Sequence, residues 1–160
     1  MPAAAPRVVQ PRRMAELRRA ERRYHLTTRD YTRLAAFRHA LRKFLRFSED
    51  AAAAVGLTGQ HYQAMLVVRG CPEAERVTIN DLAKQLLIKH NSAVELVDRL
   101  AELDLMARET SPSDRRKVEL RLTPRGRNVL AKLAAMHRSE LQRVGPELER
   151  FFSSLSKEAE

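Results

Sequence analysis

Residues 78–122 read TINDLAKQLLIKHNSAVELVDRLAELDLMARETSPSDRRKVELRL, and they carry the clearest structural signals in the chain. Thr78 and Asp81 stand at the capping-box spacing, in which a hydroxyl and a carboxylate satisfy the first free amides of a helix. Apolar residues then recur at helical spacing on both sides of a break at 88–90. Two short helices joined by a tight turn predict a helix-turn-helix.

The second half of the same stretch predicts a β-hairpin. Residues 105–108 and 117–122 have the pattern of two short strands, and a loop containing Pro112, Ser113 and Asp114 separates them. Alternation in the second strand predicts that Val118, Leu120 and Leu122 point inward, and that Glu119 and Arg121 point outward.

Helices are predicted before this region. Thr27 and Asp30 form another capping box, and the apolar periodicity after them continues to about Gly56. Thr58 can cap a second helix, which is expected to end at Gly70-Cys71-Pro72.

A helix is also predicted after the hairpin. Thr123-Pro124 supplies an N-cap and a first-turn proline, and Gly145-Pro146 is expected to interrupt the helix that follows. The predicted fold is therefore mainly α with a small β-hairpin wing: a winged helix-turn-helix flanked by N- and C-terminal helices.

Composition narrows the class of protein. The chain has 160 residues, of which 44% are hydrophobic, so it can bury one core and is too apolar to be disordered throughout. A single cysteine, Cys71, excludes a disulfide framework and a multi-cysteine metal site. Few aromatic residues and no Trp argue against a stacking platform for single-stranded nucleic acid. The sequence shows no membrane-spanning run and no signal-peptide core, so we expect a cytoplasmic protein.

The net charge of +10 is concentrated in two places. Residues 1–29 hold eight arginines against two glutamates, and residues 108–127 hold seven basic side chains against three acidic ones. Local basic patches suggest a polyanionic partner. For residues 1–29 the alternative is a solvated arginine-rich tail without a partner.

The predicted helix from about His90 to Asp104 has a polar face suited to the major groove of DNA. Its core stripe leaves Asn91, Ser92 and Glu95 on the opposite side, and these side chain types can read base edges. Basic side chains on the same helix can hold phosphates; they are Lys89, His90 and Arg99. Because Ser92 and Glu95 also stand at a capping-box spacing, the alternative is that they only start the helix.

The hairpin tip, residues 111–117, is the stronger signal for DNA binding. An arginine delivered by a loop can enter a narrow minor groove, where the negative potential is concentrated. We expect Arg116 to do this, braced by Asp114, while Arg115 and Lys117 neutralise phosphates. The alternative is a solvated turn with an incidental salt bridge.

An ordered set of short motifs runs through the same region. It comprises Leu57-Thr58, Ile79-x-x-Leu82-Ala83, Leu96-Val97-Asp98-Arg99-Leu100, Leu105, Asp114-Arg115-Arg116-Lys117-Val118 and Leu122-Thr123-x-x-Gly126. In this order and spacing, residues 30–156 resemble the MarR family of winged-helix transcriptional regulators. The resemblance implies a homodimer that straddles a palindromic operator on double-stranded DNA, with Arg116 as the minor-groove residue of an acidic-x-Arg wing motif. The chain departs from the family pattern at Leu87-Ile88-Lys89-His90, where Gly-x-Asp/Ser is usual.

The C-terminal residues support dimerisation independently of the resemblance. An apolar stripe with two adjacent phenylalanines needs a surface to bury it, and a twin helix is the simplest one. Packing on the first helix of the same chain is the alternative. The predicted interface consists of Leu141, Val144, Leu148, Phe151, Phe152 and Leu155.

Four regions are therefore expected: a basic, flexible arm (1–26), a dimerisation helix (27–57), the winged helix-turn-helix (58–122) and C-terminal helices that complete the dimerisation region (123–160). The expected function is that of a sequence-specific DNA-binding regulator, a homodimeric repressor released by a small-molecule effector. A sequence-indifferent architectural DNA-binding protein and a protein-interaction module without DNA are the alternatives.

No enzymatic motif is recognisable. The sequence has no Gly-rich phosphate loop and no nucleophile elbow, and its five histidines are scattered, so we expect no catalysis, no metal site and no cofactor. The family resemblance implies that effectors are often small aromatic acids, or that cysteine oxidation acts as the switch. Arg38, His39 and His61 are candidates for an effector pocket or ordinary surface residues, and Cys71 is expected to be an inert thiol.

Overall fold

The computed structural model describes residues 26–71, 77–111 and 117–156, together with residues 12, 14–16 and 19. Side chains are described as far as residue 153. The chain divides into two compact units, Met1–His39 and Ala40–Glu160. In the described part of the chain, no helix combines the length and the apolar character that a membrane crossing requires.

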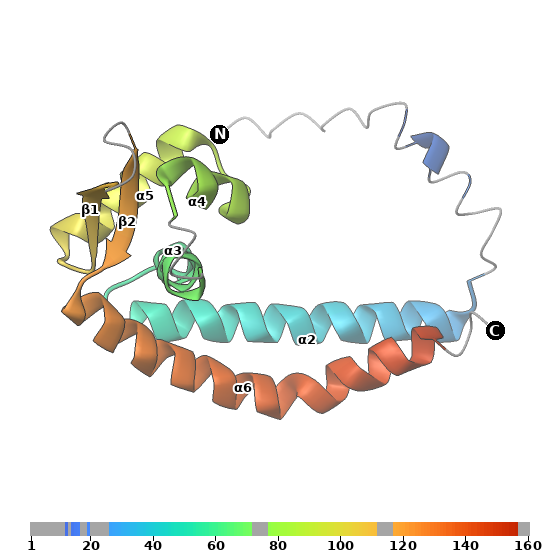
Figure 1. Cartoon of the computed structure of the whole chain (residues 1–160). Helices are drawn as coiled ribbons and strands as arrows, with labels where there is room; N and C mark the ends of the chain where they lie inside the picture. Colours follow the sequence, from blue (N-terminus) through green and yellow to red (C-terminus); the bar gives the residue numbers. More distant parts are fainter. Residues whose placement is uncertain are drawn as a thin grey trace, which may run out of the picture. The chain divides into compact units, whose positions relative to one another are not determined.

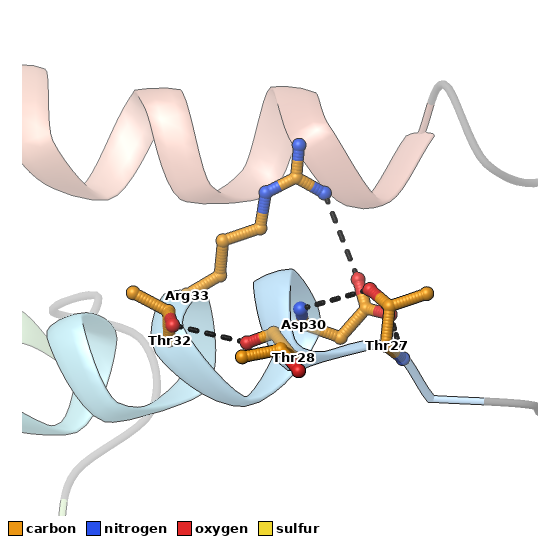
Figure 2. Close-up of polar contacts among 5 residues, drawn as sticks. All are labelled: Thr27, Thr28, Asp30, Thr32 and Arg33. Carbon is orange, nitrogen blue, oxygen red and sulfur yellow. Dashed lines mark hydrogen bonds and ion pairs between the residues drawn. The ribbon is translucent and has the colours of Figure 1, made fainter.

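The first unit contains the start of helix α2 (Thr28–Ala53). The predicted capping box is confirmed: the Thr27 amide and hydroxyl both donate to Asp30 Oδ2 at 2.7 Å, and the Asp30 amide donates to Thr27 Oγ1 at 3.3 Å (Figure 2). The hydrogen bonds from Thr27 lower the pKa of Asp30, and Arg33 lies 3.8 Å from the same carboxylate. The sequence alone therefore located the beginning of α2.

The second unit contains the predicted winged helix-turn-helix (Figure 1). Helices α3, α4 and α5 are followed by strands β1 and β2, which pair antiparallel with Met106 opposite Leu122. Helix α6 begins directly after β2. The elements are α3 (Gly59–Gly70), α4 (Ile79–Leu86), α5 (His90–Glu102), β1 (Met106–Thr110), β2 (Val118–Leu122) and α6 (Pro124–Ser156).

One apolar core holds these elements together. Helix α3 packs against α4, α5, α6 and β2, and α5 also packs against α4 and β1. Full burial of each such aliphatic side chain contributes about 1.5–3 kcal/mol. Side chains with less than 2% exposure include Met65, Leu82, Val97, Leu100, Met106 and Leu133.

Short polar motifs fix where the helices begin. Thr58 and Thr78 each close a capping box, with His61 and Asp81 as the respective third residues of α3 and α4. Thr123 caps α6, since its hydroxyl accepts from the amide of Gly126 at 2.9 Å. The predicted N-caps at Thr58, Thr78 and Thr123 are confirmed.

The turn between α4 and α5 is made without glycine. Leu87 ends α4 in the left-handed region, with φ at 55°, and its side chain is 92% exposed. The Ile88 amide then donates to the carbonyl of Ala83, which closes the turn. A non-glycine residue in this region costs about 1–2 kcal/mol, so the departure from the family pattern leaves the turn strained but intact.

Two predictions from the pattern are wrong. In β2, Val118 is exposed whereas Glu119 is 6% exposed and therefore buried. The physical reason is that residues 77–78 run along the second edge of β2: the Leu120 amide donates to the carbonyl of Val77, and Thr78 bridges to Glu119. Side chains on both faces of the strand are covered there, which simple alternation does not anticipate.

The predicted break at Gly145-Pro146 is also wrong, because α6 continues through it to Ser156. A proline in a helix removes one amide and crowds the preceding turn, which bends a long helix without ending it when the flanking turns remain intact. Figure 1 shows α6 curved along its length. The carbonyl of Pro146 still accepts a hydrogen bond, from Nε of Arg150 at 3.1 Å.

Candidate nucleic-acid interface

Helix α5 begins as the sequence predicted, at His90. Its N-cap is Lys89, whose side chain makes no capping hydrogen bond. Ser92 is therefore the third helical residue, too far into the helix to form the alternative capping box with Glu95. The side chains of Ser92 and Glu95 are left available for other contacts.

The two faces of α5 differ sharply. Ala93, Leu96, Val97 and Leu100 are buried in the core. All six residues predicted to contact DNA from this helix are exposed: Lys89, His90, Asn91, Ser92, Glu95 and Arg99. The structure therefore brings them together on one solvent-facing side of α5 and its N-cap.

The exposed face carries three acidic side chains, and two of them are paired with arginines. Arg99 Nη1 lies 2.9 Å from Glu102 Oε2, and Arg108 Nη1 of β1 lies 2.5 Å from Asp98 Oδ1. Among the described residues, Glu95 has no ion-pair partner. Glu95 is therefore the acid on this face best placed to accept a hydrogen bond from a base amino group.

The wing is described at its base. The Ser111 amide donates to the carbonyl of Lys117 at 2.9 Å, and the side chain of Lys117 is exposed. Hydrogen bonds from Thr78 lower the pKa of Asp81, with a smaller contribution from the nearby charge of Lys117, so the wing base lies close to the start of α4. The predicted tip residues Asp114, Arg115 and Arg116 lie outside the described residues.

His61 has a role that the sequence analysis missed. Its Nδ1 accepts a hydrogen bond from the Thr58 amide at 3.1 Å, and its own amide donates to Thr58 Oγ1 at 3.2 Å. Partial burial lowers the pKa of His61, and the positive charge of Arg99 on α5 lowers it further. The Thr58-x-x-His61 spacing was the available signal, but capping boxes usually have Glu or Gln at the third position.

This geometry predicts how stability depends on pH. Since the pKa of His61 lies below its ordinary value of 6.5 in the folded chain, the folded state binds fewer protons than the unfolded state just below that pH. The contribution of His61 is present at neutral pH and is lost as the pH falls from 6.5 through the folded pKa. Denaturant titrations at several pH values between 5 and 8 measure the loss.

The matched control is His61→Gln, because glutamine completes the same capping box without titrating. Relative to the natural chain, this variant should lose less stability between pH 7 and pH 5. Identical pH dependence in both proteins would exclude His61 as the source.

A second histidine joins three helices. His137 of α6 is 4% exposed; its Nδ1 lies 2.7 Å from the carbonyl of Leu133, and its Nε2 lies 2.8 Å from Ser48 Oγ on α2. The ring stacks on Tyr62 of α3 at a centroid distance of 4.0 Å. Because a carbonyl only accepts, Nδ1 carries the hydrogen and Nε2 accepts from Ser48 in the neutral ring. His137 thus ties the winged helix to the long helices.

The other candidate residues are distributed as follows. In the predicted dimer stripe, Leu141 is 46% and Phe152 is 55% exposed, Leu148 and Phe151 are half-buried, and Val144 is 2% exposed. The side chain of Leu155 lies outside the described part. Arg38 and His39 are exposed, and Cys71 is half-buried at the C-cap of α3.

With this geometry in place, comparison with known proteins shows which proteins the chain is similar to. Residues 55–117 match the family model described as "MarR family", a range that covers α3 to the base of the wing. The structure also matches AbsC, a MarR family transcriptional regulator from Streptomyces coelicolor, at a TM-score of 0.66 and 23% identity, over 84% of this chain and 91% of that chain. Residues 55–117 are therefore similar to the MarR family.

Two further relatives are informative. A predicted transcriptional regulatory protein for the hcr operon of Thauera aromatica is 31% identical over 90 residues, a match that spans 56% of this chain and about half (52%) of that relative. The transcriptional repressor CouR, solved bound to a 23-mer DNA duplex, has 26% identity and a TM-score of 0.60, over 78% of this chain and 90% of that chain.

Proposed function

We propose that this protein is a member of the MarR family and a sequence-specific regulator of transcription that binds double-stranded DNA as a homodimer. The observation that carries the proposal is the exposed polar face of α5, which starts at His90 within a helix-turn-helix and beside the β1–β2 hairpin. A helix of this kind fits the major groove, and its first residues meet base edges. The structural relative CouR is a repressor bound to DNA, which supports the same class of function here.

The chemistry of that face favours a specific over an architectural binder. Asn91 can pair with adenine through two hydrogen bonds, and Glu95 can accept from the amino group of cytosine. A sequence-indifferent binder gains affinity mainly from Lys and Arg against phosphates. An exposed face that mixes amide, hydroxyl and carboxylate groups is better suited to reading bases.

Two surfaces support the homodimer. Leu141 and Phe152 of α6 are exposed large apolar side chains, and so are Leu41 and Leu45 of α2. Exposed apolar side chains gathered on long helices are typical of a protein–protein interface, and a two-fold dimer pairs identical surfaces. Two-fold symmetry would present two α5 helices to the two halves of a palindromic operator.

The remaining part of the proposal concerns regulation. We propose that the dimer acts as a repressor and that a small-molecule effector releases it from DNA, as the family resemblance implies. The junction of α2, α3 and α6 around His137 is a place where a change in helix packing would reach the winged helix.

The wing gives the first test of the DNA-binding proposal. Arg116→Ala should weaken binding to the operator by about 1–3 kcal/mol, because a minor-groove arginine is lost. A gel-shift titration measures the change. Arg138→Ala, which removes an exposed arginine from the middle of α6, is the matched control and should bind like the natural chain. Equal affinities for the two variants would remove the wing from the mechanism.

The function itself is tested with fragments of the host genome. The purified protein is incubated with the fragments and an excess of random-sequence competitor DNA, and the retained fragments are sequenced. A regulator retains a few discrete intervals. Uniform retention would favour the architectural alternative, and no retention at low salt would contradict DNA binding altogether.

A further inference from the structure

The ion pair between Asp98 of α5 and Arg108 of β1 places an acidic side chain on the face that is proposed to contact DNA. Asp98 follows Asn91 by two helical turns and lies within one turn of both Glu95 and Glu102, so it stands in the middle of the face proposed to meet DNA. A carboxylate at this position repels phosphates. The chain nevertheless has an acid here, paired with Arg108 of β1 across ten residues of sequence.

The partner residue is held by the hairpin. Arg108 lies opposite Leu120 in the β1–β2 ladder, and the Leu120 amide donates to the carbonyl of Val77 at 2.8 Å. The position of Arg108 is therefore fixed through backbone hydrogen bonds to β2 and to the residues that precede α4. Its guanidinium reaches Asp98 Oδ1 at 2.5 Å. The pair connects the middle of α5 to a strand of the wing.

The other paired acid on this face makes no such connection. Arg99 and Glu102 both belong to α5, three residues apart, so their contact leaves the wing unaffected. The Asp98–Arg108 pair therefore differs from its neighbour in linking two elements that must reach the same duplex.

We propose that Asp98 and Arg108 are positioning residues, which set the angle of the β1–β2 hairpin relative to α5 so that both elements engage one DNA site. This inference rests on the proposed DNA-binding function. The side chains are half exposed, at 49% for Asp98 and 34% for Arg108, so the pair adds little to the stability of the fold. Loss of the pair should therefore change the affinity for DNA more than the stability of the fold.

The test depends on whether one substitution strengthens or weakens the binding of DNA. Asp98→Asn removes a negative charge from the DNA-facing surface, so simple electrostatics predicts tighter binding. A positioning role predicts weaker binding, by up to about fivefold, because one contact that orients the hairpin relative to α5 is lost. Affinity is measured by fluorescence anisotropy with a duplex that the natural protein binds, and thermal unfolding checks that the melting temperature is almost unchanged.

The matched control is Glu102→Gln, which removes the same charge from the same face without touching the wing. It should bind at least as tightly as the natural chain. A double-mutant cycle with Asp98→Ala and Arg108→Ala should show that the double variant binds about as weakly as either single one. Hydroxyl-radical footprints of Asp98→Asn should lose protection beyond the sites contacted by α5.

The outcomes separate the two proposals. If the natural protein binds no duplex, the proposed function fails. If it binds, and Asp98→Asn binds as tightly as Glu102→Gln with an unchanged footprint, the positioning role is wrong while the proposed function stands. Additive effects in the cycle would equally contradict it, since they would mean that Arg108 contacts DNA independently of Asp98.

Discussion

The Gly126→Ala variant is expected to lose about 3 kcal/mol of folding free energy, a large fraction of the roughly 5–15 kcal/mol that is typical of a folded domain. A Cβ atom at Gly126 would lie 1.9 Å from the carbonyl oxygen of Leu105 and 2.8 Å from its carbon. Both are backbone atoms, so no side-chain rotation relieves the contact.

The surrounding hydrogen bonds prevent a small shift of the helix. The Thr123 amide donates to the same Leu105 carbonyl, and the Thr123 hydroxyl donates to the carbonyl of Asp104 at 2.7 Å. The Leu105 amide is itself bonded to the carbonyl of Leu100 in α5. A displacement of α6 would therefore disturb the end of the hairpin and the end of α5 together.

The same substitution elsewhere in α6 gives a matched control. A Cβ at Gly145 would meet no atom within 4 Å. Gly145→Ala should change the stability by less than about 1 kcal/mol, because the better helix propensity of alanine is opposed by contact between its Cβ and the ring of Pro146, the next residue. Urea unfolding followed by circular dichroism measures both variants. Equal midpoints for the two would contradict the close approach of α6 to Leu105.

Phe152→Asp is the second large effect that we expect. Phe152 is 55% exposed, and its ring contacts Phe151 edge to face at 5.5 Å between centroids. A carboxylate in the proposed dimer interface would be desolvated without a partner, so the variant should sediment as a monomer. Because a dimer gains affinity from two linked DNA contacts, the monomer should bind a palindromic operator roughly a hundredfold more weakly.

Ser153→Asp places the same charge on the neighbouring exposed residue, on another side of the helix. This control should remain dimeric and should keep its affinity for DNA. Sedimentation velocity and anisotropy report the two properties separately. An intact dimer for Phe152→Asp would show that the exposed part of the C-terminal stripe is not the interface.

Local signals predicted the elements of the fold well. Four of the helix starts depend on a threonine hydroxyl that accepts from an amide three residues later, and at Thr27, Thr58 and Thr78 a side chain at that third position completes a capping box. The helix-turn-helix and the hairpin followed from periodicities within single segments. The resemblance to the MarR family is confirmed for residues 55–117, where each of its motifs is a short local pattern.

The two wrong predictions have different causes. One depends on a contact between residues that are distant in sequence, and the other applied an average rule for proline in helices to a helix that does not follow it. Burial of Glu119 depends on residues 77–78, which precede it by about forty positions and run along the same strand. The continuity of α6 through Pro146 depends on the strength of the turns on either side, which no local rule measures.

The candidate site was predictable in part. The exposed face of α5 followed from helical periodicity, because the core stripe fixes the opposite side. The pairing of Asp98 with Arg108 and the contact between His137 and Ser48 join separate elements, so only the folded chain reveals them. His61 shows a third case, in which the spacing was visible but the residue type was unusual for a capping box.

Selection of bound sequences from a random DNA library, with the purified protein, tests whether a symmetric pair of chains reads duplex DNA through α5. The enriched pool should contain an inverted repeat, whose two half-sites are centred about one helical turn, ~10 base pairs, or a multiple of it apart. A retained pool with no common motif, or with a single motif that has no two-fold symmetry, would contradict this mode of binding.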